Sequence, residues 1–168
     1  MGICAEELRN LVITPTLEHL GETGAHALAA ENLLLGTAAQ ESGLGFHLRV
    51  KRARGLGIYQ ITPQIHINIW DRYLINHPDL ASNIRGLASQ HEFLAHPHAE
   101  LATNLSYATA IAWMIYRRCG KPLPPADDML ALGKFWARHF PHRSAETARD
   151  FSATYKRCVN AKDNELAA

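Results

Sequence analysis

The sequence has almost no excess of charge of either sign. Its 168 residues include 17 lysines and arginines and 16 aspartates and glutamates, which gives a formal net charge of +1 with histidine neutral. Domains whose surface is dedicated to nucleic acid usually carry a marked basic excess, because contacts with phosphates supply much of their affinity. The charge balance therefore argues against a nucleic-acid partner.

Cysteine and long apolar runs are also scarce. Cys4, Cys119 and Cys158 show no CxxC spacing, so we favour reduced thiols, with a bridge between Cys119 and Cys158 as the alternative. No stretch reaches the roughly 18 uninterrupted apolar residues that a membrane helix needs. The N-terminus has early acids and no basic start followed by an apolar run, unlike a secretory signal. We therefore expect synthesis in a cytoplasm and no membrane partner.

The common nucleotide and metal patterns are missing. There is no GxxxxGK[ST] loop and no GxSxG elbow, and Gly55-Leu-Gly57 is too short for a dinucleotide fingerprint. Ten histidines are many for this length, but His91-Glu92 is not followed by the second histidine of an HExxH pair. We expect no metal and no cofactor.

The periodicity of apolar residues predicts one mostly α-helical domain over residues 1–168. Hydrophobic residues make up 47% of the chain, enough for a core without staples. Glycines at 43, 45, 55 and 57, with alternating Phe46, Leu48 and Val50, predict a small β or irregular lobe. The predicted helices cover 4–20 with an interruption at Pro15, about 26–42, 63–76, 79–87 capped by Asp79, 98–118, 126–140 and 144–159 with a cap-like Ser144; residues 91–98 are a predicted loop and about 160–168 a polar tail.

One carboxyl has an unusual position. The run 27–38 has helical periodicity, and Glu41 lies three and four positions beyond Ala38 and Thr37, so it continues their apolar face. Apolar surroundings disfavour the charged form of a carboxyl, which raises its pKa and suits it to donate a proton near neutral pH. The alternative is a helix that frays at Ser42 and leaves Glu41 in solvent.

Four cations fall within six residues of the predicted lobe: Arg49, Lys51, Arg52 and Arg54. We favour a solvated hairpin tip. The alternatives are a patch for an anionic polymer and a DNA contact of a helical regulator, although the neighbouring glycines argue against a recognition helix.

Two motifs resemble a known family. Glu41-Ser42, followed by Gly57-Ile-Tyr-Gln60-Ile-Thr-Pro63, is similar to the Glu-Ser and Gly-Leu-Met-Gln-x-x-Pro motifs of lytic transglycosylases of the soluble-lytic-transglycosylase (SLT) type. The resemblance covers about residues 28–158, and these two motifs are its specific part. Arg54-Gly55 departs from the Gly-Ala that is common there, and a later Ala-Tyr-Asn motif is absent. The strings most similar to bacteriophage and prophage members are His66, Trp70-Asp-Arg-Tyr-Leu74, Asn104-Leu-Ser-Tyr107-Ala-Thr-Ala and Phe135-Trp136 before Tyr155.

The resemblance implies a lysozyme-like fold of the goose-type lysozyme class, with the small lobe after the catalytic helix. It implies peptidoglycan glycan strands as the substrate and action on the cell wall, as an endolysin or a virion-associated protein that depends on a holin or a virion. The roles it implies are the catalytic acid for Glu41, a hydrogen-bond partner for Ser42, groove lining for Tyr59 and Gln60, and positions over the site for Tyr107 and Tyr155.

The sequence offers no second acid near the first, because none occurs between Glu41 and Asp71. Glycosidases generally use two carboxylates, and substrate-assisted enzymes are exceptions. One acid suffices when the acetamido group of N-acetylmuramic acid supports the reacting centre, which predicts cleavage of the β-1,4 bond between N-acetylmuramic acid and N-acetylglucosamine with 1,6-anhydro ends. The alternatives are hydrolysis, with Asp71 or Glu92 assisting, and a virion component that binds glycan without cutting it.

Overall fold

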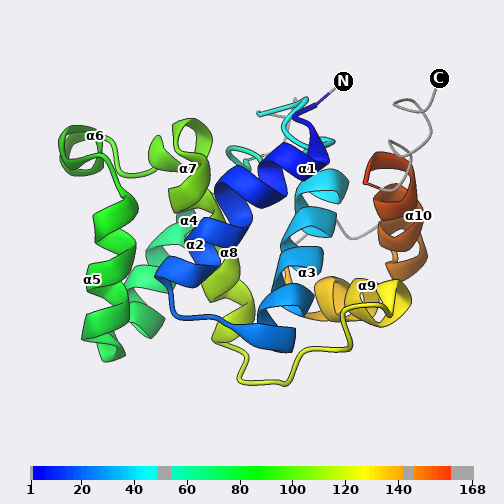
Figure 1. Cartoon of the computed structure of the whole chain (residues 1–168). Coiled ribbons are helices and arrows are strands. Elements are labelled where there is room, and N and C mark those ends of the chain that lie inside the picture. The colour runs from blue at the N-terminus through cyan, green and yellow to red at the C-terminus, as the bar shows by residue number, and fades with distance from the viewer. Residues whose placement is uncertain (1, 49–53, 142–145, 160–168) are drawn as a thin grey trace.

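The computed structural model describes residues 2–48, 54–141 and 146–159, and this part of the chain is mostly α-helical, as predicted. Two helices occupy the middle of the molecule, α3 (Gly24–Ser42) and α8 (Leu105–Arg117) (Figure 1). Helices α9 (Met129–His139) and α10 (Ala148–Cys158) pack on α3, while α5 (Pro78–Leu87) and α7 (Glu100–Thr103) pack on α8. The core is continuous across both central helices.

The N-terminal segment is one rod rather than two separate helices. It comprises α1 (Ala5–Leu8), a π-helical turn η1 (Arg9–Ile13) and α2 (Thr14–His19). Pro15 has no N–H and its ring would collide with a carbonyl one turn earlier in a regular α-helix. The wider π turn directly before it lets the rod continue across the proline.

Helix α3 is buried on almost every side. Leu33, Leu34 and Leu35 are consecutive and fully buried, which places this helix inside the fold rather than on its surface. The helix ends at Ser42, and Gly43 follows in the left-handed conformation with φ of 62° and donates its N–H to the Ala39 carbonyl. The alternative in which this helix frays at Ser42 is therefore wrong.

The lobe after α3 is irregular. In the described residues its one strand-like pairing is an antiparallel bridge between Leu56 and Ile61, which closes a tight turn. Arg54 is exposed at its edge, whereas Arg49, Lys51, Arg52 and Val50 lie outside the described residues. The prediction of a small β or irregular lobe is confirmed in its irregular form.

The segment after the lobe contains α4 (Pro63–Asn68), the π turn η2 (Ile69–Tyr73) and the 3-10 turn η3 (Leu74–Asn76) before α5. Asp79 does not cap α5, because Pro78 already belongs to the helix and the N-cap is His77. The predicted loop over 91–98 is wrong in part, since α6 runs from Gln90 to Ala95.

The predicted helix over 98–118 is interrupted. α7 ends at Thr103, and Asn104 takes an extended conformation with φ of −122° and ψ of 101°. The Asn104 side chain accepts the N–H of Tyr107 and so caps a new helix, α8. The capping bond satisfies an N–H that a helix start would otherwise leave unpaired.

The two C-terminal helices start at side-chain caps. Asp128 accepts the N–H of Ala131 at the start of α9. Thr147 and Asp150 form a reciprocal capping box at the start of α10. The cap-like role predicted for Ser144 is thus taken by Thr147, and Ser144 itself lies outside the described residues.

Two expectations from composition can be compared with the structure. No helix in the described ranges is long and apolar enough to cross a membrane. Cys119 and Cys158 are both thiols, so the alternative of a bridge between them is wrong.

Candidate active site

Glu41 lies in the last turn of α3 with its side chain turned into the protein. Only 8% of the residue is exposed. The Trp136 indole N–H of α9 donates to Glu41 Oε1 over 3.1 Å, and the Trp136 ring packs against Phe151 of α10 with centroids 5.4 Å apart. Trp136 therefore holds one oxygen of the Glu41 carboxyl in place.

Tyr116 of α8 contacts α3 one turn before Glu41. Thr37 donates its hydroxyl to the Leu33 carbonyl over 2.7 Å, so the Tyr116 hydroxyl, 2.6 Å from Thr37 Oγ1, must donate to it. Burial raises the pKa of Tyr116 well above its usual value of 10, and the Glu41 charge raises it further. Tyr116 therefore stays a neutral hydroxyl whose proton is directed at α3, one turn before Glu41.

Ser42 joins the end of α3 to the turn that carries the second motif. Its Oγ lies 2.6 Å from the Ile58 carbonyl and 3.1 Å from the Ala38 carbonyl, and it accepts the N–H of Gly45 over 2.8 Å. The residue is 3% exposed. The two segments on which the family resemblance rests are thus bonded directly to each other by this hydroxyl.

Gln60 ties the lobe together from inside. Its Nε2 donates to the carbonyls of His47, Leu48 and Gly57 over 3.2, 3.1 and 2.8 Å. Its backbone has φ of 50°, a left-handed conformation that costs a non-glycine residue roughly 1–2 kcal/mol. Gln60 Oε1 is buried and has no hydrogen-bond partner. Backbone strain and an unused polar atom in one residue are typical of a functional position.

Tyr59 is fully buried, and its hydroxyl lies 3.0 Å from Thr109 Oγ1 of α8. Burial raises its pKa above the usual value of 10, so the side chain is neutral. In this arrangement Tyr59 anchors the turn to α8 from behind and offers no surface to a ligand.

Tyr107 belongs to a separate cluster with His66, Trp70 and His98, in which Tyr107 and His66 are buried. The Trp70 indole N–H lies 2.9 Å from the Tyr107 hydroxyl and 3.2 Å from His66 Nε2, so Nε2 carries no hydrogen and accepts the Tyr107 hydroxyl over 2.6 Å. His66 Nδ1 then carries the hydrogen and donates to His98 Nδ1 over 2.9 Å. Burial, followed by the neighbouring His98, lowers the pKa of His66 from 6.5 to about 4, which agrees with a neutral ring. Tyr107 is fully buried, so it positions α4 against α8 rather than covering Glu41.

Tyr155 contacts the middle of α3, away from the end that carries Glu41. Its hydroxyl donates to Asn32 over 3.0 Å and accepts from Arg9 over 3.1 Å, while Arg9 also pairs with Glu31. Asn32 precedes Glu41 by nine residues, which is about 13 Å along a helix. The structure therefore places Tyr155 away from the Glu41 carboxyl.

The described residues hold one other buried carboxyl, Glu100. It accepts from Asn104 Nδ2 over 2.8 Å and from the Ser89 N–H over 3.2 Å, so it closes the break between α7 and α8. Asp71 is exposed on η2, and the Glu92 side chain lies outside what the structure describes. No group of three or more His, Cys, Asp or Glu residues in the described ranges could hold a metal ion.

Sequence reasoning did not identify Trp136 and Tyr116 as partners of the Glu41 region. The usable signal was their polar atoms, since a buried indole N–H or phenol hydroxyl must find a hydrogen-bond partner. Nothing in the sequence indicated that the partner of Trp136 lies 95 residues earlier.

Comparisons with protein-family models, with curated proteins and with solved structures give no match for this chain.

Proposed function

We propose that the protein is a lytic transglycosylase that cleaves peptidoglycan, with Glu41 as its single acid and base and a lysozyme-like fold around it. The observation that carries this proposal is the direct bond between the two motif segments. Ser42 follows the acid, and its hydroxyl holds the Gly57–Gln60 turn through the Ile58 carbonyl at 2.6 Å. A buried carboxyl oriented by an indole stands beside this junction.

The reaction needs two proton transfers, one from Glu41 and one back to it. Protonated Glu41 donates to the glycosidic oxygen as the bond from C1 of N-acetylmuramic acid to that oxygen breaks, and the acetamido oxygen of the same sugar stabilises the positive charge on C1. The Glu41 carboxylate then removes the proton from the C6 hydroxyl, whose oxygen bonds to C1. The products are a 1,6-anhydro end and a free 4-hydroxyl, and no water is consumed.

Trp136 suits this cycle because its N–H already donates to Oε1 of Glu41. A donor that is already oriented requires no rearrangement during the reaction. Ser42, Gln60 and Tyr59 act as positioning residues for the lobe beside the carboxyl in this proposal, and Tyr107 positions α4 against α8. The exposed ring of Phe46, 58% accessible in the loop after Glu41, offers a face on which a sugar can stack.

The test is mass spectrometry of muropeptides released from purified peptidoglycan. We expect anhydro-muramyl ends, lighter by one water than hydrolytic products, and no release by Glu41→Gln. Glu31→Gln, altered in the same helix ten positions earlier, is the matched control and should retain activity. Reducing ends alone would establish hydrolysis, and a wild-type protein that binds glycan without releasing fragments would establish a binding module.

A further inference from the structure

Phe151 of α10 lies between α3 and α9, the two helices that carry Glu41 and Trp136. Its side chain is fully buried and packs on the Trp136 ring, with centroids 5.4 Å apart and an angle of 31° between the ring planes. This separation is in the range of favourable aromatic pairs. Helix α10 therefore contacts the indole that donates to Glu41 Oε1.

Two glycines make room for the Phe151 ring. Gly36 and Gly133 are buried inside α3 and α9, and neither has a positive φ, so they differ from other helical residues only in lacking a side chain. A Cβ at Gly36 would overlap the tip of the Phe151 ring, and one at Gly133 would lie 3.2 Å from Phe151 Cδ1. Glycine is a poor helix former, and the close approach of this ring gives a physical reason for it at both positions. We call Gly36 and Gly133 the glycine slot.

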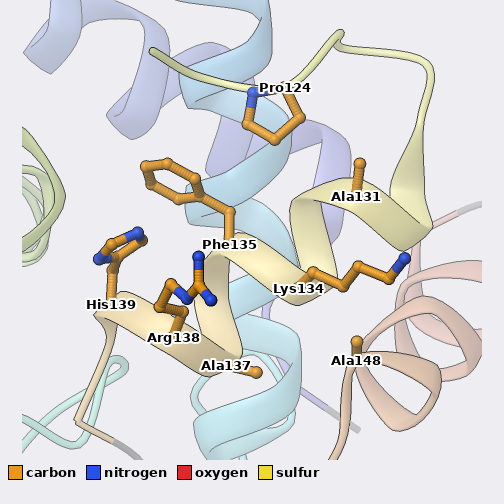
Figure 2. Close-up of a pocket in the computed structure, with 8 residues that line it drawn as sticks. All are labelled: Pro124, Ala131, Lys134, Phe135, Ala137, Arg138, His139 and Ala148. Carbon is orange, nitrogen blue, oxygen red and sulfur yellow. The ribbon is translucent and has the colours of Figure 1, made fainter. Parts of the chain in front are cut away.

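The spacing of residues on α9 and α10 brings the two rings together. Ala148, at the start of α10, lies beside α9 (Figure 2), and a Cβ at Gly133 would come within 2.6 Å of the Ala148 carbonyl oxygen. Phe151 follows Ala148 by three positions, and Trp136 follows Gly133 by three positions. Residues three apart lie on the same face of a helix, so the close contact at Gly133 continues into the contact between Phe151 and Trp136.

We propose that Phe151 is a positioning residue for the acid: held in the glycine slot, it fixes the plane of the Trp136 ring and so directs the indole N–H at Glu41 Oε1. A buried indole changes the direction of its N–H when it rotates about its side-chain bonds, and a ring packed on its face prevents that rotation. Helix α10 thereby acts on the Glu41 carboxyl through α9. The expected effect on turnover rests on the proposed function, whereas the effect on the indole does not.

The first experiment follows the indole N–H resonances of the full-length protein by NMR as the pH is changed. Trp136→Phe identifies the Trp136 resonance, and Glu41→Gln identifies the part of its pH-dependent shift that Glu41 causes. We expect Phe151→Leu to reduce this Glu41-dependent shift by about half or more, because a hydrogen bond weakens steeply when its donor is misaligned. Phe151→Met, whose flexible chain fills gaps, should have the same effect.

The matched control is Phe93→Leu, which removes a ring that packs on a different indole, Trp70, with centroids 5.7 Å apart. It should leave the Glu41-dependent shift of Trp136 unchanged. A wild-type Trp136 resonance with no Glu41-dependent shift, or a shift that persists in both Phe151 variants, would overturn the proposal.

The second experiment separates positioning from packing. Gly36→Ala should displace the Phe151 ring, lower the melting temperature and reduce the Glu41-dependent shift. Combining Gly36→Ala with Phe151→Leu should restore most of the melting temperature, because the smaller side chain leaves room for the added methyl group, but it should not restore the shift. If the shift recovers together with the melting temperature, Phe151 contributes to stability alone and the proposal is wrong.

The third experiment measures release of anhydro ends. We expect kcat to fall about threefold or more in Phe151→Leu with little change in KM, because the substitution misorients the acid and leaves glycan binding intact. A kcat equal to that of the wild type would also overturn the proposal. If the wild type releases no fragments, the proposed function fails, and the indole resonances still decide whether Phe151 positions Trp136.

Discussion

His66 should make the stability of this protein depend on pH in a defined window. The residue is 2% exposed and its ring is neutral, with Tyr107 donating to Nε2 and His98 accepting from Nδ1. An unfolded chain binds a proton at this histidine below pH 6.5, whereas the folded protein binds one only near pH 4. The contribution of His66 to the free energy of unfolding is thus fully present above pH 6.5 and is lost as the pH falls toward 4.

The size of the loss follows from these two pKa values. For a single group, it is about 2 kcal/mol at pH 5 and about 3 kcal/mol at pH 4. Burial is the larger cause of the penalty, and the neighbouring His98 adds to it. Protonation of Nε2 would also end its acceptance of the Tyr107 hydroxyl. Arg85, which stacks on Trp70 at 5.2 Å, adds positive charge beside the cluster.

The assay is urea unfolding at pH 7 and pH 5 for the wild type and His66→Gln. Glutamine retains a polar atom for Tyr107 but does not titrate, so the difference between the two pH effects isolates His66. We expect the wild type to lose about 2 kcal/mol more than the variant. His77→Gln, at an exposed histidine, should behave like the wild type. An equal loss in wild type and His66→Gln would show that His66 is protonated in the folded protein and that the neutral cluster described above is wrong.

Two further substitutions test the active-site geometry and the lobe. Trp136→Phe removes the donor to Glu41 and retains an aromatic ring, so kcat for release of anhydro ends should fall about tenfold or more with little change in KM. The control is Trp113→Phe, which removes a similar bond to Glu22 away from Glu41. It should lower stability without that loss of kcat. Gly57→Ala would force a side chain onto the Leu101 carbonyl at φ of 71° and should destabilise the protein by about 3 kcal/mol or more in thermal unfolding. Gly21→Ala, with φ of 83° and open space around it, should cost only about 1 kcal/mol, and equal effects at both glycines would contradict the close packing of the lobe.

The α-helical character of the chain could be predicted because apolar periodicity is a local signal that packing rarely overrides. Helix α3 was expected within two residues of its observed ends, because its apolar residues have helical periodicity and Gly43 follows directly after it. The break at Asn104 was missed because the apolar periodicity continues across it from Leu101 to Leu105 and Ala108. Only the asparagine, a strong N-cap residue, indicated a new start.

Only those residues of the candidate site that are close together in the sequence could be predicted. Glu41 and the Ser42 and Gln60 motifs are close in sequence, so spacing and resemblance identified them. The roles of the side chains were harder to predict. Tyr59 was expected to line a groove, but it is buried against Thr109. Whether a tyrosine faces a ligand or the core depends on which helix covers it, and here that helix begins more than forty residues later.

The difference between contacts that are short in sequence and contacts that are long in sequence has a consequence for the folding of the protein during synthesis. The bond from Ser42 to Ile58 spans 16 residues, and the bonds from Gln60 to the lobe span 3 to 13, so this part can form early from local contacts. The indole that orients the acid comes from a residue 95 positions later. A nascent chain therefore contains Glu41 and its helix long before Trp136 is made, and the proposed activity requires that α9 has been made and packed against α3.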